Sequence, residues 1–166
     1  MSPKREYDKP AVTVDCVILC ATNTNGDELA DEATAKVSPG RAGEAYEILL
    51  IQRAREPFAG RWALPGGFVN KDEPLAAAAS RELEEETGLR VEQLEQVGAF
   101  GNPGRDPRGW TISVAYRGVV PVSESAVSGR DDAKEARWFP LDDLPPLAFD
   151  HAEIITAALR AGSILD

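Results

Sequence analysis

The sequence predicts a single α/β domain in which a mixed β-sheet lies between helices. Several segments rich in β-branched and aromatic residues are bounded by Gly, Pro or Asn, which is typical of strands. Two segments of helix-favouring composition end at a glycine, which is typical of helices. The 166 residues are enough for one hydrophobic core, so we expect one domain over 1–166.

The first two expected strands are separated by a long loop. Residues 12–21 (VTVDCVILCA) and 47–53 (EILLIQR) are mostly aliphatic, and several are β-branched, which indicates strands. Residues 22–46 are polar and contain several Gly and Pro residues, so we expect a loop there. Residues 56–69 (EPFAGRWALPGGFV) then hold a short apolar run that a Pro-Gly-Gly sequence interrupts.

A helix is expected over residues 74–87. Pro74 suits the first turn, the alanines favour helix, and Gly88 suits the position just past the end. At about 100° per residue, one apolar stripe of this helix would pack against the sheet. The stripe comprises Ala76, Ala79 and Leu83.

The second half of the chain has three further expected strands and a closing helix. The strands are expected at 91–101, 110–120 and 135–141, and the helix is expected at 150–162. The Gly- and Pro-rich residues 102–109 (NPGRDPRG) form a loop between the first two of these strands. Asp150 is the expected N-cap of the closing helix, and Gly162 is its stop.

The charge of the chain restricts the class of partner. Hydrophobic residues make up 43% and charged residues 28%, which is ordinary for a globular protein. The net charge of −10 argues against nucleic acid, because phosphate backbones select basic surfaces. A small phosphorylated ligand is compatible with it, since a divalent cation reverses the local sign of an acidic site.

The cysteines and the N-terminus indicate the compartment. Cys16 and Cys20 lie in the first expected strand, and we interpret them as small core residues rather than as a redox or metal pair. Free thiols fit a reducing cytoplasm. The first ten residues contain no apolar signal core, and no apolar run approaches the roughly 20 residues that span a membrane. We therefore expect a cytoplasmic protein without a membrane partner.

The segment RELEEE (81–86) concentrates carboxylates on the expected first helix. Glu82, Glu85 and Glu86 share one face at spacings of three and four residues, whereas Glu84 points away. A like-charge pair at i,i+4 costs ~0.2–0.5 kcal/mol even when it is exposed. A divalent metal would remove the repulsion, and carboxylate oxygens are the ligands that Mg²⁺ and Mn²⁺ prefer. The alternative is a solvated acidic face, which is the common role of a charge run.

The spacing around these carboxylates is more specific than their charge. It reads Gly67-x5-Glu73-x7-Arg81-Glu82-Leu83-x-Glu85-Glu86-x-Gly88-Leu89. At average residue usage, a chance match of the exact residue types at a given start is on the order of 10⁻⁸. The segment 67–89 resembles the box of the Nudix hydrolase family.

The resemblance implies a metal-dependent hydrolase of nucleoside diphosphates linked to another moiety. It implies Mg²⁺ or Mn²⁺ as the cofactor, with ligands from Gly66 (the backbone carbonyl), Glu82, Glu85 and Glu86. The metal would neutralise phosphoryl charge and activate a water. The catalytic residues are expected to be Glu82, Glu85 and Arg81, with Glu82 as first candidate for the base.

Other box positions are implied to have supporting roles. Glu73 and Arg81 look like the family's supporting pair, in which a guanidinium orients carboxylates and offsets their repulsion. Gly67 and Gly88 are positions where a side chain would obstruct the loop.

Segments outside the box resemble the ADP-ribose pyrophosphatase-like branch of the family. The likeness covers roughly residues 10–162, apart from the loop at 22–46. It implies an α/β/α sandwich, a homodimer in many relatives, and hydrolysis of ADP-ribose to AMP and ribose 5-phosphate. One alternative is a nucleoside triphosphate pyrophosphatase that clears damaged nucleotides.

A further alternative is an ADP-ribose-sensing module. Regulators of this branch carry a DNA-binding domain after the Nudix domain, which we do not expect here because the chain is acidic and ends four residues after Gly162. The intact carboxylates argue against a module that has lost catalysis.

Several arginines are candidates for substrate binding. Arg105 and Arg108 lie in the loop 102–109, where they would contact a phosphate or the terminal ribose, or else form a solvated turn with Asp106. Arg53 and Arg55 follow a strand and could face the pyrophosphate.

The remaining candidates are left open. His151 is the only histidine, and we interpret it as structural. Four aromatic residues could stack on an adenine or lie in the core: Trp62, Phe68, Phe100 and Trp110. An acid outside the box could assist the metal or the base, and the candidates are Glu124, Asp131 and Asp132.

Overall fold

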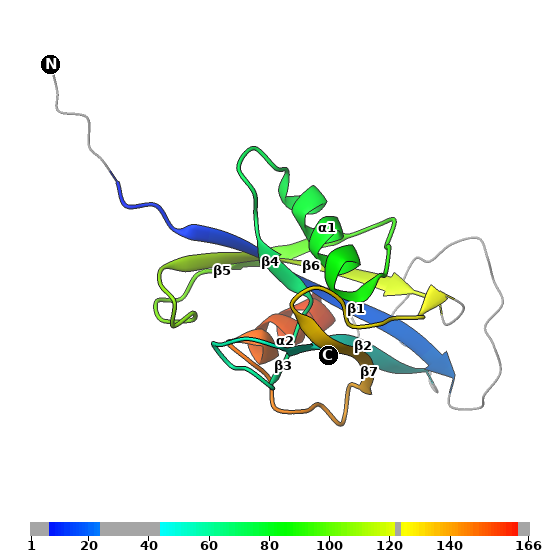
Figure 1. The fold of residues 1–166 in the computed structure, drawn as a ribbon. Helices are drawn as coiled ribbons and strands as arrows, with labels where there is room; N and C mark the ends of the chain where they lie inside the picture. Colours follow the sequence, from blue (N-terminus) through cyan, green and yellow to red (C-terminus); the bar gives the residue numbers. More distant parts are fainter. Residues whose placement is uncertain (1–6, 24–43, 122–123, 163–166) are drawn as a thin grey trace, which may run out of the picture.

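The computed structural model describes residues 7–23, 44–121 and 124–162 (Figure 1). Its strands are β1 (Ala11–Asn23), β2 (Glu44–Arg53), β3 (Trp62–Ala63), β4 (Gly66–Phe68), β5 (Glu95–Phe100), β6 (Thr111–Val120) and β7 (Ala133–Pro140). Its helices are α1 (Leu75–Thr87) and α2 (His151–Ala161).

The strands within the described residues form one mixed, seven-stranded sheet. Its main path has the order β3-β2-β1-β6-β5, while β4 pairs with β1 and β7 pairs with β2. The central pair β1 and β6 is parallel, and the other pairs are antiparallel. The expected mixed sheet is therefore confirmed.

The two helices cover opposite faces of the sheet, as Figure 1 shows. Successive residues of β1 alternate between the two faces, as the pleat of a strand requires. Val14 and Cys16 pack in the core on the α1 side, and Val17 and Leu19 pack in the core on the α2 side. Because the side chains of the central strand β1 point alternately to the two faces, each face can pack against a helix. This gives the α/β/α arrangement.

The long loop is shorter than predicted at both of its ends. Residues 22–23 belong to β1 and residues 44–46 belong to β2, because the two strands keep pairing out to Asn23 and Glu44. Residues 24–43 lie outside the described residues. The region around the Pro-Gly-Gly sequence, which we did not assign, forms the short strands β3 and β4.

The prediction of which α1 residues form the apolar stripe is partly wrong. Ala79 and Leu83 are buried against the sheet as expected, but Ala76 is exposed and Ala78 is buried in its place. The helix is rotated so that Ala78, rather than Ala76, faces the core. In the described part of the chain, neither helix is long and apolar enough to cross a membrane.

Candidate functional site

A cavity of about 340 Å³ brings together α1, β4, the end of β2, the loop after β5 and the start of α2. Its wall includes all four residues predicted to bind metal: Gly66, Glu82, Glu85 and Glu86. Arg53 and Arg108 also line it, so one cavity contains both acidic and basic residues.

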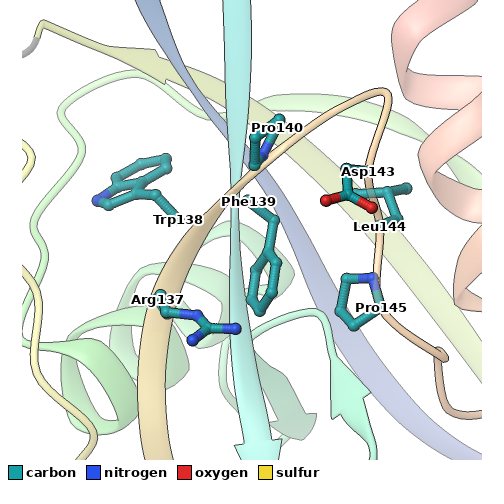
Figure 2. Close-up of a pocket in the computed structure, with 7 residues that line it drawn as sticks. All are labelled: Arg137, Trp138, Phe139, Pro140, Asp143, Leu144 and Pro145. Atoms are coloured by element: carbon teal, nitrogen blue, oxygen red, sulfur yellow. The ribbon is translucent and has the colours of Figure 1, made fainter.

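A second hollow of about 470 Å³ lies beside the end of β7 and the residues that follow it (Figure 2). Figure 2 shows Arg137 beside Phe139, and the guanidinium carbon of Arg137 lies 4.3 Å from the centroid of that ring. Asp143 is the one acid of its lining, among residues 137–145. The clustered carboxylates thus belong to the first cavity, which is the candidate active site.

The conformation of the box depends on close approaches at its glycines. A Cβ at Gly67 would lie 2.5 Å from a carboxylate oxygen of Glu82, and one at Gly66 would lie 2.0 Å from the carbonyl oxygen of Val14. Gly88 ends α1 with φ at 76°, in the left-handed region that favours glycine. The predicted obstruction at Gly67 and Gly88 therefore has a physical basis.

Glu86 is the most buried carboxylate of the site. It is 7% exposed, and it accepts a hydrogen bond of 2.9 Å from the backbone N–H of Gly66. Burial raises its pKa to about 8, and the nearby charges of Glu82 and Asp15 act in the same direction. Burial also raises the pKa of Glu82. At both groups the effect of burial outweighs the nearby positive charge, which comes from Arg81 at Glu82 and from Arg53 at Glu86. A bound cation would stabilise the charged form of each carboxylate.

Arg81 connects the carboxylates of the box. Its Nε donates to Glu73 at 2.7 Å, and its Nη1 donates to Glu82 at 2.7 Å and to Glu85 at 3.1 Å. Its Nη2 donates to the carbonyl of Phe68 at 3.1 Å. The hydrogen bond from Arg81 lowers the pKa of Glu73 to about 2. This is the arrangement predicted for a guanidinium that orients carboxylates.

The donor set of the site fits a hard cation. The three carboxylates lie in one cavity, and two of them have raised pKa values. Across the described segments, no three acidic, histidine or cysteine side chains converge as they would around an ion. Instead, the guanidinium of Arg81 bridges Glu82 and Glu85. Metal binding would therefore require the Arg81 contacts to rearrange.

Arg105 lines the cavity, but its side chain is almost fully buried and its guanidinium is occupied by an ion pair. Its side chain is 4% exposed, and Nε and Nη2 donate to the carboxylate of Asp150 at 2.8 and 2.6 Å. Asp15 lies 3.9 Å away from it. Asp150 stands at the N-cap position of α2 but makes no capping hydrogen bond, because its side chain binds Arg105. Asp150 is thus the predicted N-cap residue, but its side chain binds Arg105 instead of the N–H groups of the helix. The geometry favours Arg108 over Arg105 as a substrate contact.

The other arginines differ in exposure. Arg108 is paired with Asp106 as the turn alternative predicted, and it also lines the cavity. Arg53 is half-buried in the wall. Arg55 is largely exposed and pairs with Asp132 at 3.2 Å.

Asp131 is the best placed of the three acids left open. Asp131 and Asp132 line the cavity, whereas Glu124 is not part of its lining. Asp132 is paired with Arg55, while the charge of Asp131 contributes to raising the pKa of Glu82.

His151 is held in one neutral form. Its Nδ1 accepts a hydrogen bond of 2.9 Å from the backbone N–H of Leu64, so the proton of the ring is on Nε2, 3.4 Å from Asp15. Burial lowers its pKa. This geometry supports the structural interpretation of His151.

Among the aromatic candidates, Phe68 alone lines the cavity, while Trp62 is buried in the core. Phe149 and Asp15 are among the cavity residues that sequence reasoning missed. Asp15 is an acid within an otherwise apolar strand, and that signal could have identified it. Phe149 has no such signal, because its place depends on a positive φ of 51°.

Comparison with known proteins supports the geometry. Residues 38–158 match the family described as NUDIX domain. An ADP-ribose pyrophosphatase of Methanocaldococcus jannaschii is 46% identical over 114 residues, which cover 69% of this chain and 66% of that protein. The ADPR responsive transcriptional repressor NtrR of Acinetobacter baylyi is 35% identical over 93% of this chain and 55% of its own length. The matches thus span less than two thirds of either relative.

Solved structures share the fold. The NUDIX domain of Shewanella oneidensis NrtR, complexed with ADP ribose, has a TM-score of 0.74 and 31% identity, over 93% of this chain and 90% of that one. A MutT/nudix family protein of Enterococcus faecalis has a TM-score of 0.76 and 33% identity, over 99% of this chain and 69% of that one.

Proposed function

This chain belongs to the NUDIX domain family, and from that premise we propose that it is a metal-dependent hydrolase of nucleoside diphosphate derivatives, with ADP-ribose as the first candidate substrate. The reaction adds one water across the P–O–P bond and gives AMP and ribose 5-phosphate. The observation that carries the proposal is the cavity in which the box carboxylates meet Arg53 and Arg108. Such a site can bind a metal and phosphate oxygens together.

Each group in the cavity has a distinct role in this proposal. Glu82, Glu85 and Glu86 would hold Mg²⁺ or Mn²⁺, with the carbonyl of Gly66, and the bound metal would supply charge neutralisation and an activated water. Arg81 orients the carboxylates through its hydrogen bonds.

The remaining roles concern substrate and proton. Arg53 and Arg108 bind phosphate oxygens, because guanidinium groups match phosphate geometry. Glu82 is the first candidate to accept the proton of the attacking water on a carboxylate oxygen. Asp131 is the first candidate for assistance from outside the box, since it lines the cavity and its charge acts on Glu82.

A second candidate function is the sensing of ADP-ribose without turnover. It is favoured by the repressor relative, which matches 93% of this chain, and by the ADP-ribose complex of a related NUDIX domain. The predicted homodimer and the cytoplasmic location are compatible with both functions and stay predictions.

A hydrolysis screen separates these candidates. Purified protein is incubated with ADP-ribose, other nucleoside diphosphate sugars, dinucleoside polyphosphates and nucleoside triphosphates, with Mg²⁺ and with Mn²⁺. We expect ADP-ribose to be cleaved best and to yield AMP. Tight binding of ADP-ribose without product would favour the sensor, and a preference for a triphosphate would replace the substrate assignment.

A further inference from the structure

Two arginines of the cavity wall contact the same aromatic ring. The guanidinium carbon of Arg53 lies 4.9 Å from the centroid of the Phe149 ring, and that of Arg108 lies 5.5 Å from it. Arg108 also lies 4.9 Å from the centroid of the Phe68 ring. These four side chains, all of which line the cavity, form what we call the arginine–phenylalanine cluster.

Each guanidinium in the cluster is fixed through its Nε side. Arg53 Nε donates to the carbonyl of Pro57 at 2.7 Å. Arg108 uses Nε and Nη2 to bind the buried carboxylate of Asp106, the shortest contact being 2.7 Å. A guanidinium has five N–H donors. The hydrogen bonds just described do not use the Nη1 group of either arginine. Both cations are thus oriented while retaining donors for an anion.

The positive charges of Arg53 and Arg108 repel each other. Burial lowers the pKa of Arg53, and the nearby charge of Arg108 lowers it further. The negative face of an aromatic ring attracts a guanidinium, so a shared ring offsets part of this repulsion. An anion bound by both arginines would remove the remainder.

The backbone of Phe149 presents its ring to both arginines. Its φ of 51° lies in the left-handed region, which is uncommon for a bulky residue and persists only where the surroundings fix it. The ring packs edge-on against Phe58, with 4.8 Å between the two centroids. Arg53 ends β2, just past a shift in the register of its pairing with β7.

We propose that Phe149 is a positioning residue that holds Arg53 and Arg108 together as one receptor for a phosphate group of the substrate. The identity of that substrate rests on the proposed function, but the receptor binds a phosphate group whether or not hydrolysis follows. The pyrophosphate of ADP-ribose and the phosphates of a nucleoside triphosphate offer the same chemistry, and their KM values distinguish them.

Binding of inorganic pyrophosphate in EDTA tests the receptor without metal or turnover. By isothermal titration calorimetry at low ionic strength, Phe149→Leu should bind pyrophosphate roughly tenfold or more weakly than wild type, as for the loss of a charge-assisted contact. Phe149→Tyr keeps the ring and should restore the affinity. Phe100→Leu is the matched control, since Phe100 is a half-buried phenylalanine outside the cavity lining, and it should bind like wild type.

A double-mutant cycle separates positioning from a general structural effect. Arg53→Gln and Phe149→Leu each raise the Kd for pyrophosphate by some factor. If Phe149 acts through Arg53, the double variant should raise the Kd by less than the product of these two factors. In Mg²⁺, Phe149→Leu should also raise KM for ADP-ribose by a larger factor than it lowers kcat. If Phe149→Leu does not fold, Arg53→Lys serves instead, because a lysine keeps the charge but lacks the Nε anchor to Pro57.

Equal pyrophosphate affinity of wild type and Phe149→Leu would overturn the proposal. So would additive effects in the cycle, or a wild-type protein that does not bind pyrophosphate at millimolar concentration. None of these outcomes bears on hydrolysis, which the substrate screen measures separately.

Discussion

Two carboxylates of the cavity, Glu85 and Glu86, have different environments. Their roles are therefore tested by different measurements. Glu85 is exposed and bonded to Arg81, whereas Glu86 is buried beside the Gly66 amide. Their shared helix face followed from residue spacing alone. The bridging position of Arg81 was implied by the family resemblance, and its individual partners are known only from the structure.

Glu85→Gln should leave the fold intact and lower turnover by about 100-fold or more, since even residues that merely support a metal ligand cost 10–100-fold when changed. The substitution removes a ligand charge and keeps the shape. The measurement is kcat for ADP-ribose at saturating Mg²⁺. Glu84→Gln is the control, because Glu84 lies on the same helix and pairs with the exposed Arg90. A near-native rate for Glu85→Gln would refute the metal-binding face.

Glu86 should make the metal-free protein less stable as pH rises. Its pKa in the folded protein, about 8, lies above its ordinary value of 4.5, so the folded state holds the proton more tightly. Its stabilising contribution is complete below about pH 4.5 and is lost as pH approaches 8. Glu86→Gln does not titrate there, so its melting temperature in EDTA should exceed that of wild type increasingly from pH 5 to pH 8. A difference that does not change with pH would contradict this.

At the scale of elements, the loop between β5 and β6 is anchored by a buried ion pair. Arg105 joins this loop to the start of α2 through Asp150, and Asp15 of β1 lies beside the pair. The sequence predicted a Gly- and Pro-rich loop with arginines facing a substrate. It could not show that Arg105 points inward, because its partner is 45 residues away in the chain.

Arg105→Ala should destabilise the fold by about 3–5 kcal/mol, because it leaves buried carboxylates without their cation. Urea unfolding measures the loss. Arg55→Ala serves as the control, since it removes a pair in which Arg55 is 78% exposed, and such surface pairs contribute about 0–1 kcal/mol. If both variants unfold at the same urea concentration, Arg105 does not anchor the loop.

The prediction of elements was most accurate where the pattern was long. The two helices and the strands β1, β2, β6 and β7 were located from apolar runs and terminal residues. The ends of β1 and β2 were missed because their pairing continues through polar residues such as Thr22. The strands β3 and β4 are too short to give a pattern. They pair with the parts of β2 and β1 that lie beyond the ladder joining those two strands.

For the whole molecule, repulsion among the box carboxylates should make metal binding a source of stability. A ligand that binds only the folded state stabilises it by about 2.7 kcal/mol at 100 times its Kd. Millimolar Mg²⁺ or Mn²⁺ should therefore raise the melting temperature of wild type at pH 8, and by less in Glu86→Gln. Samples treated with EDTA and kept free of divalent metal give the baseline. An unchanged melting curve would argue against a metal site in the folded protein.

The parallel pairing of β1 with β6 also determines the order in which this protein can form during synthesis. Ala11 pairs with Thr111, and Cys20 pairs with Val120, so the centre of the sheet joins segments about a hundred residues apart. Pairings this distant slow folding, because a long stretch of chain must be closed before any contact compensates for the lost entropy. On the ribosome, β1 can pair with β2 and β4 soon after they emerge, but its edge toward β6 stays unpaired until residues 111–120 have been made. This edge of β1 is thus expected to need protection from aggregation until β6 is available.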